Sequence, residues 1–513
     1  MNKLFVKYPL LIIVILAVLL RLPLLNGSFW MDEAAQALEV IRPLNQQLDI
    51  IADFQPPLLH LILHFAQYFS VSEWYLRTIG ALIPGLITII YTYKIAETLF
   101  SKRVAMIAGL LLATSSFHIF FSQELRPYSL PTAFALMSMY HFIVSVESKK
   151  KFNLFGKNTD DNMVFLTIYN VLGLYSSYLY PFFMLAQISY SIFNLKFKKA
   201  KELMISFGFS IMAFVPFIPI FLKQLAEGGN VRNSLPGWDQ VVSINQLKAL
   251  PLVFGKLIFG ILPLDINPII VLLTTLLGIS AVGATFYVFK NYKKYNLKIF
   301  FYWLVVPLLT AWLVSFVVPV IRPKRLLFLL PGIYILISHL GTNTLEKYLR
   351  NKLKNVSFIE KTTLFLILSV VLINFVGIVG YFTMPSLQRE DWRSLNNQIH
   401  QDFKVQETLL VYSFPNQFAP MKWYERTWEN EFPIYSTNKL YIEDVNDLAN
   451  DIKLAANYKT ILVFDYLRDL TDPNKKIEKY LIDLGFKEVG VLDYPNIGFV
   501  RVFMHPVNVI GYK

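Results

Sequence analysis

The chain has 513 residues, of which 55% are hydrophobic and only 16% are charged, and this composition excludes an ordinary soluble protein of that length. A net charge of +13 would suggest a nucleic-acid partner for a soluble chain, but here the lysines gather in loops between apolar runs, so we expect no nucleic acid. The lack of cysteine excludes disulfide bonds and thiolate metal sites.

Runs of roughly 20 apolar residues recur along the chain, as is typical of a polytopic α-helical membrane protein. The first run begins with Lys3 and Lys7, as a signal peptide would, but Arg21-Leu-Pro stands where a small-residue cleavage site would lie. We therefore interpret it as a retained helix. The sequence predicts about eleven spans, near residues 8–25, 74–99, 104–121, 128–147, 163–177, 179–195, 203–222, 268–289, 299–320, 325–342 and 362–384.

The loops between these spans alternate in charge. One set is rich in lysine and arginine, and the positive-inside rule places it, with the N-terminus, in the cytoplasm. The other set has few basic residues, so the loop over residues 26–73 and the segment beyond about residue 385 are predicted to face the exterior. The expected location is the inner or plasma membrane of a bacterium, with the C-terminal domain periplasmic or extracellular.

The exterior loop over residues 26–73 contains two stretches with helical spacing, AAQALEVIRPL and QPPLLHLILHFAQYF. Both are too short or too polar to span, so we expect helices that lie at the membrane surface. Asp32 and Glu33 follow the apolar stretch Phe29–Met31. A carboxylate that is partly desolvated there has a raised pKa and can act as a base near neutral pH. The plain alternative is a solvated acidic pair.

His60 and His64 are spaced i,i+4 in the second stretch. Two histidines at this spacing can bind a metal, but the acid of an H-E-x-x-H pattern is absent. We therefore favour pocket-lining or structural roles and assign no metal ligand.

Two polar clusters interrupt the apolar spans on the exterior side. FFSQELRPYSL, residues 120–130, carries Gln123, Glu124, Arg126 and Tyr128; an arginine beside a glutamate at this depth either pairs internally or meets an anion. VIRPKRLLFLLPG, residues 320–332, carries the cations Arg322, Lys324 and Arg325 against the positive-inside trend. At a helix start these cations would suit a phosphate.

The segment beyond residue 385 changes character. In LQREDWRSL, Trp392 is interpreted as an interfacial anchor and Arg393 as its solvated neighbour. Further on, ETLLVYSF, EFPIYS and KTILVFDYL predict strands, and LGFKEVGVLDYPNIGFVRVFMH predicts a hairpin. FAPMKWYER, VNDLANDIKLAANY and NKKIEKYLIDLG predict helices between them. This alternation predicts a small three-layer α/β domain, in which no glycine-rich phosphate loop suggests a cofactor.

The order of these motifs resembles the GT-C glycosyltransferases over residues 1–395. The motifs are the acidic pair after the first span, PPL…H, SQE-R-Y-SL, the arginine-rich turn before a late span, and DWR after the last span. The resemblance is to the bacterial branch similar to protein O-mannosyltransferases and lipid A aminoarabinose transferase. It implies a GT-C catalytic domain over residues 1–384 and an exterior α/β domain over residues 385–513 that serves acceptor binding or support.

The resemblance also implies the chemistry. The donor would be a polyprenyl-phosphate-linked sugar at the membrane lipid, and transfer would occur with inversion to a lipid, glycan or protein acceptor on the exterior face. Asp32 would be the base and Glu33 its helper. Arg126 and Arg325 would bind the donor phosphate. The other residues expected to bind the donor or shape the site are Arg322, Lys324, Gln123, Glu124, Tyr128, His60, His64, Trp392 and Arg393. Some GT-C enzymes use a divalent cation and others do not, so that cofactor is left open.

Two departures limit the resemblance. The chain lacks a WWD-G-type sequence, which argues against an oligosaccharyltransferase catalytic subunit, and its tail is not a β-trefoil. The main alternative function is a transporter or flippase for a lipid-linked sugar, which would need the same cations but no base, yet the sequence has no clear internal repeat. A receptor-like scaffold would leave the acids and arginines unexplained.

Overall fold

The computed structural model describes residues 8–147, 161–238, 241, 243–262, 297–349, 358–444 and 455–505, without the side chains of 343–349 and 358–364. The described chain divides into two compact units. Unit 1 comprises Met1–Leu25, Leu48–Lys223 and Val242–Leu387, and unit 2 comprises Asn26–Gln47, Gln224–Val241 and Gln388–Lys513. Residues 26–47, which were predicted as part of an exterior loop, thus group with the C-terminal segment.

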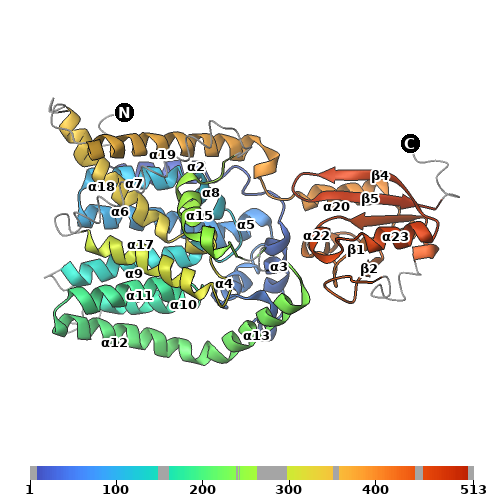
Figure 1. Ribbon diagram of the computed structural model, residues 1–513, viewed down its shortest axis with the longest axis horizontal. Helices are drawn as coiled ribbons and strands as arrows, with labels where there is room; N and C mark the ends of the chain where they lie inside the picture. The colour runs from blue at the N-terminus through green and yellow to red at the C-terminus, as the bar shows by residue number, and fades with distance from the viewer. Residues whose placement is uncertain are drawn as a thin grey trace. The chain divides into compact units, whose positions relative to one another are not determined.

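Unit 1 is a bundle of apolar helices, most of which run side by side (Figure 1). They are α2 (Pro9–Leu19), α4 (Leu58–Ala66), α5 (Glu73–Arg77), α6 (Ile83–Leu99), α7 (Lys102–Ala113), α8 (Ser116–Phe121), α9 (Ser129–Glu147), α10 (Asp161–Leu174), α11 (Tyr180–Asn194), α12 (Phe197–Phe214), α15 (Gln246–Phe259), α17 (Lys298–Val314), α18 (Leu329–Leu349) and α19 (Phe358–Thr383).

Four helical stretches among the described residues are long and apolar enough to cross a membrane: Glu73–Leu99, Ser129–Glu147, Phe197–Ser234 and Phe365–Thr383. Shorter apolar helices accompany them. The predicted span at 268–289 lies outside the described residues, so the number of spans and their orientation stay predictions.

Two helical features were not predicted. The span expected at 203–222 continues from α12 through one 3-10 turn into α13 (Ile218–Ser234). Helix α15 lies in a stretch that was predicted as exterior loop; Asn245 caps its start by accepting a hydrogen bond from the backbone N–H of Leu247 at 3.0 Å. Helix α15 contains Pro251, and a proline inside a stretch usually argues against a helix there.

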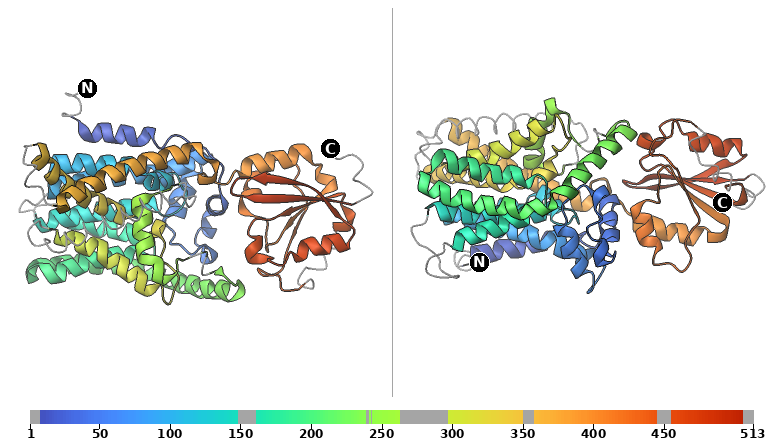
Figure 2. Two further views of the ribbon diagram at one scale, coloured as in Figure 1. Left: turned by 45° about the horizontal axis from the view of Figure 1, so that its top comes forward. Right: turned by 90° about the horizontal axis from the view of Figure 1, so that it is seen from below.

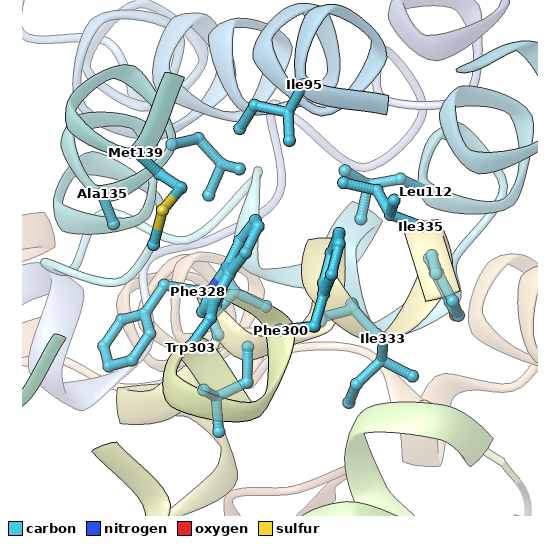
Figure 3. Close-up of a cluster of buried hydrophobic side chains, with 14 of the residues drawn as sticks. Ile95, Leu112, Ala135, Met139, Phe300, Trp303, Phe328, Ile333 and Ile335 are labelled. Atoms are coloured by element: carbon cyan, nitrogen blue, oxygen red, sulfur yellow. The ribbon is translucent and has the colours of Figure 1, made fainter. Parts of the chain in front are cut away.

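Large apolar side chains from several helices fill the centre of unit 1 (Figure 3). Phe300 and Trp303 of α17 stack with ring centroids 5.7 Å apart. The indole N–H of Trp303 donates to the carbonyl of Phe328 at 3.0 Å, so this buried polar group is satisfied just before α18. Ile95 of α6 and Met139 of α9 belong to the same core.

Arg21, at the end of the first apolar run, is fully buried in unit 1. Its guanidinium donates to the carbonyl of Ala17 at 2.9 Å and to the carbonyl of Ala113 at 3.0 Å, and lies 2.7 Å from Nδ1 of His118. The two carbonyls belong to the last turns of α2 and α7, which have no partners within their own helices. One cation therefore caps two helix ends, where the helix dipoles favour positive charge.

Unit 2 contains a five-stranded sheet of order β2-β1-β3-β5-β4. Its strands are β1 (Thr408–Tyr412), β2 (Ile434–Ser436), β3 (Thr460–Phe464), β4 (Lys487–Tyr494) and β5 (Gly498–Met504). The first three are parallel, and β4 and β5 form an antiparallel hairpin whose second strand pairs with β3. The predicted strands and hairpin are confirmed, whereas most of the helix expected at 445–458 lies outside the described residues.

Helices cover both faces of this sheet (Figure 2). On one face, α23 (Lys476–Asp483) contributes Ile477 and Leu481 to a core with β1 and β3. On the other face, Trp392 of α20 (Trp392–Asp402) packs against Phe464 of β3. Both central strands are buried along their whole length, which explains their continuous apolar sequences.

Helix α3 (Met31–Val40) packs against α21 (Ala419–Glu425) within unit 2. Just before α3, the ring of Phe29 meets Trp423 edge to face at 5.6 Å, and the backbone N–H of Phe29 donates to the hydroxyl of Tyr424 at 2.8 Å. The segment that carries Asp32 is therefore attached to the C-terminal α/β fold.

We expect Arg21→Met to lower the free energy of unfolding by about 2–5 kcal/mol, because the carbonyls of Ala17 and Ala113 lose their buried donor. The check is the thermal midpoint in detergent micelles, with Arg103→Met, at the exposed start of α7, as the matched control. Equal midpoints for Arg21→Met and Arg103→Met would contradict this capping role.

Candidate active site

The two acids after the first apolar run have different environments. Asp32 and Glu33 lie in the first turn of α3, where the N–H groups of the helix end favour acidic side chains. Glu33 is fully buried, and its Oε2 lies 3.6 Å from Nε of Arg389, which is also buried. Asp32 is only half-buried. Glu33 thus anchors α3 through a buried ion pair, while Asp32 remains the more accessible carboxylate.

Glu390 is a site residue that the sequence reasoning missed. Its Oε2 accepts hydrogen bonds from the indole N–H of Trp392 at 2.6 Å and from the backbone N–H of Met31 at 3.3 Å. Its Oε1 accepts from the hydroxyl of Tyr466 at 2.9 Å. In LQREDWRSL, Glu390 is only an acid that precedes the predicted residues Trp392 and Arg393, and nothing in that stretch indicates its burial.

Burial raises the pKa of Glu390 to about 7, and the negative charge of Asp32 acts in the same direction. The hydrogen bonds from Trp392, Tyr466 and Met31 favour the ionised form and lower the pKa, but burial outweighs them. A carboxyl whose pKa lies near neutrality therefore neighbours Asp32.

Trp392 and Arg393 do not have the roles that the plain interpretation gave them. Trp392 is fully buried against the sheet, with its ring centroid 5.1 Å from that of Tyr466, so the interfacial-anchor interpretation is wrong. Arg393 donates from its side chain to the carbonyl of Asn26 at 2.9 Å, and its backbone N–H donates to Oγ of Ser28 at 3.1 Å. It holds the approach to α3 and is not merely a solvated neighbour.

A second polar cluster lies in unit 1. Asp53 ends a short 3-10 helix, η2 (Ile51–Asp53), and its Oδ1 lies 3.2 Å from Nη1 of Arg126. Oδ2 of Asp53 lies 2.5 Å from Nε2 of His60 and also accepts from the side-chain amide of Gln55. His60 and Arg126 were predicted as site residues, whereas Asp53, which joins them, was missed.

Burial raises the pKa of Asp53, but the positive charge of Arg126 and the hydrogen bonds from His60 and Gln55 outweigh it. The net pKa lies below the ordinary value of 3.8. Asp53 is therefore ionised at neutral pH and fixes the direction of the Arg126 guanidinium.

Arg322, Lys324 and Arg325 lie in and next to η5 (Pro323–Leu326), a 3-10 helix that precedes α18. Nζ of Lys324 lies 5.0 Å from the ring centroid of Tyr128. Arg325 donates to the carbonyl of Val320 at 3.1 Å. Burial and the charge of Arg325 lower the pKa of Arg322, so an anion placed here would stabilise its protonated form. Because α18 begins at Leu329, Arg325 lies before this helix and not in its first turn.

The remaining predicted residues are buried in unit 1. Gln123 donates to the carbonyl of Arg21 at 2.7 Å and accepts from the hydroxyl of Tyr381 at 2.9 Å, which gives it a structural role. Glu124 is also buried, and its carbonyl accepts from the backbone N–H of Arg126 at 2.7 Å. His64 packs edge to face on Tyr68, so the two histidines of α4 have different partners.

Comparisons with known proteins agree with this architecture. Residues 55–222 match the family model described as dolichyl-phosphate-mannose-protein mannosyltransferase. ArnT from Cupriavidus metallidurans in the apo state aligns with 97% of this chain and 98% of its own, at a TM-score of 0.56 and 11% identity. The chain has the GT-C fold. A comparison with the sequences of curated proteins gave no match.

Two further structures share the GT-C fold. ArnT bound to undecaprenyl phosphate aligns over 98% of both chains at a TM-score of 0.56 and 11% identity. The archaeal oligosaccharyltransferase AglB from Archaeoglobus fulgidus, in complex with an inhibitory peptide and a dolichol-phosphate, aligns with 97% of this chain and 74% of its own at 0.53 and 13%. The resemblance that the order of motifs indicated is confirmed.

We expect Asp53→Asn to weaken the pH dependence of stability. Because the folded-state pKa of Asp53 is lowered, its stabilising contribution is present above the unfolded-state pKa near 3.8 and is lost as the pH falls through the folded value. The variant should be less stable than the parent by about 1–3 kcal/mol at neutral pH, and this difference should shrink as the pH falls below 3.8. Thermal midpoints across that range check it, with exposed Asp49→Asn as control.

Proposed function

We propose that this chain is an integral-membrane inverting glycosyltransferase that moves a sugar from a polyprenyl-phosphate-linked donor to an acceptor hydroxyl on the exterior face. The match of residues 55–222 to the mannosyltransferase family carries the proposal. The GT-C structures of ArnT and AglB that contain undecaprenyl phosphate and dolichol-phosphate support a lipid phosphate as the donor's carrier.

The donor phosphate is the leaving group, so negative charge grows on it as the sugar departs. Guanidinium groups that are already oriented toward that position lower the barrier. Arg126 is assigned this role because Asp53 holds it by an ion pair at 3.2 Å. Arg322, Lys324 and Arg325 supply a second group of cations, and the lowered pKa of Arg322 favours an anion beside it. Asp53 is a positioning residue in this scheme.

The acceptor hydroxyl is a poor nucleophile until a base removes its proton. Asp32 is assigned as this base because it is the accessible carboxylate of the pair, whereas Glu33 is committed to Arg389. Its carboxylate takes the hydroxyl proton while the acceptor oxygen forms a bond to the anomeric carbon. The bond from that carbon to the phosphate oxygen breaks, and its electron pair leaves with polyprenyl phosphate, which inverts the configuration.

We expect Asp32→Asn to lower the rate of polyprenyl phosphate release by about 10²–10⁴-fold, because the amide cannot accept the acceptor proton. The measurement uses the protein in nanodiscs with a panel of polyprenyl-phosphate sugars and candidate acceptors. Asp49→Asn, at an exposed acid of the same predicted loop, should keep the parent rate.

Equal release by the parent and Asp32→Asn would remove Asp32 as the base but keep the transferase. Donor binding without consumption by any acceptor of the panel would oppose the transferase and support transport of the lipid-linked sugar.

We expect Arg126→Gln to raise the dissociation constant for polyprenyl phosphate by about 10–100-fold, because a charge-assisted hydrogen bond to the phosphate is lost. Binding is measured by titration of nanodiscs with polyprenyl phosphate at two salt concentrations. Arg103→Gln, on the predicted cytoplasmic side, is the matched control. An unchanged constant in Arg126→Gln would assign the phosphate to the other cationic group.

A further inference from the structure

Parallel α/β sheets usually bind ligands beyond the carboxyl ends of their strands, where neighbouring connections diverge. In unit 2 this place lies between β1 and β3, because β1 pairs on its other side with β2. Tyr466 follows the end of β3, and α21 follows β1. The hydroxyl of Tyr466 contacts Glu390, and α21 packs against the Asp32 helix. The strand ends therefore meet the segment that carries the proposed base.

Glu390 connects these parts. One of its oxygens accepts from Tyr466, and the other accepts from the backbone N–H of Met31, the first residue of α3. The indole of Trp392, buried on the sheet, donates to the same oxygen at 2.6 Å. The carboxyl group is therefore fixed from three sides, and one of these contacts sits next to Asp32 in the chain.

We propose that Glu390 is a positioning residue for Asp32: it fixes the start of α3 through the Met31 N–H and places a second carboxyl group beside the base. This proposal rests on the proposed function, because it concerns the same transfer site. It also gives the C-terminal α/β fold a task in the reaction, namely to hold the base and its neighbour together.

The negative charge of Asp32 raises the pKa of Glu390, because two nearby carboxylates resist simultaneous ionisation. The other groups that face Glu390 are Trp392 and Tyr466, whose hydrogen bonds favour its ionised form. Glu33 of α3 lies beside Arg389 of the Glu390 segment.

The first test is the pH dependence of transfer in Glu390→Gln. Glutamine can still accept hydrogen bonds from Trp392 or Tyr466, but a neutral amide holds the Met31 N–H more weakly than a carboxylate does. We expect the parent's rate to rise near pH 7, where Glu390 ionises, and we expect the variant to lack this rise and to have a maximal rate about tenfold lower. Asp391→Asn is the matched control, because Asp391 is exposed and asparagine also caps α20 well.

Tyr466→Phe should move this rise instead of removing it. The hydrogen bond from Tyr466 lowers the pKa of Glu390, so its loss should keep Glu390 protonated to higher pH and move the rise in rate upward. A merely structural role for Glu390 would lower the rate in both variants without changing the position of the rise. That outcome would overturn the proposal.

A second readout does not depend on turnover. Infrared titration of the carboxyl C=O band should show a group that titrates near pH 7, is absent in Glu390→Gln, and moves to lower pH in Asp32→Asn. An unmoved band in Asp32→Asn would show that the two carboxyls are not coupled and would overturn the proposal. Absence of transfer by the parent protein would instead count against the proposed function, whichever way the band responds.

Discussion

One buried guanidinium joins the ends of two helices in unit 1. Arg21 bonds the last turns of α2 and α7, and Gln123 bonds the carbonyls of Arg21 and Pro23. An apolar bundle provides no water for helix ends, so every such carbonyl needs a donor from the protein itself. The ends of α2 and α7 are therefore held together by a charge that the apolar bundle encloses.

The two polar clusters show how environment separates carboxyl groups that look alike in the sequence. Asp53 lies among cationic and hydrogen-bonding partners, which lower its pKa below the ordinary value. Glu390 lies against aromatic rings and a second acid, and its pKa rises to about 7. Pairs of acids with opposite shifts mark different tasks: Asp53 keeps its charge to orient a cation, whereas Glu390 can exchange a proton near neutrality.

Some of this could be predicted from the sequence. The strands β1 and β3 were predictable because strands that are buried on both faces have continuous apolar sequences. Helix α3 was predictable from the helical spacing of its apolar residues. The acids Asp32 and Glu33 were recognised, but their division of labour depends on Arg389, which is distant in sequence.

The roles of the remaining site residues depend on partners that are distant in sequence, which no local pattern indicates. Asp53 looks like a loop residue until His60 and Arg126 meet it. Trp392 follows a predicted span, as an interfacial anchor would, and only the sheet behind it shows that it belongs to a core. The raised pKa of Glu390 was not predicted, because it results from burial and not from any residue type nearby in the sequence.

The attachment of α3 to the C-terminal fold has a consequence for biosynthesis. Phe29 and Tyr424 contact each other across 395 positions of sequence. At translation rates of about 5–20 residues per second, roughly 20–80 s separate the synthesis of these two partners. During that interval the segment with Asp32 has emerged but lacks the surface on which it folds. A partly synthesised chain therefore cannot hold Asp32 in place until α21 has been made.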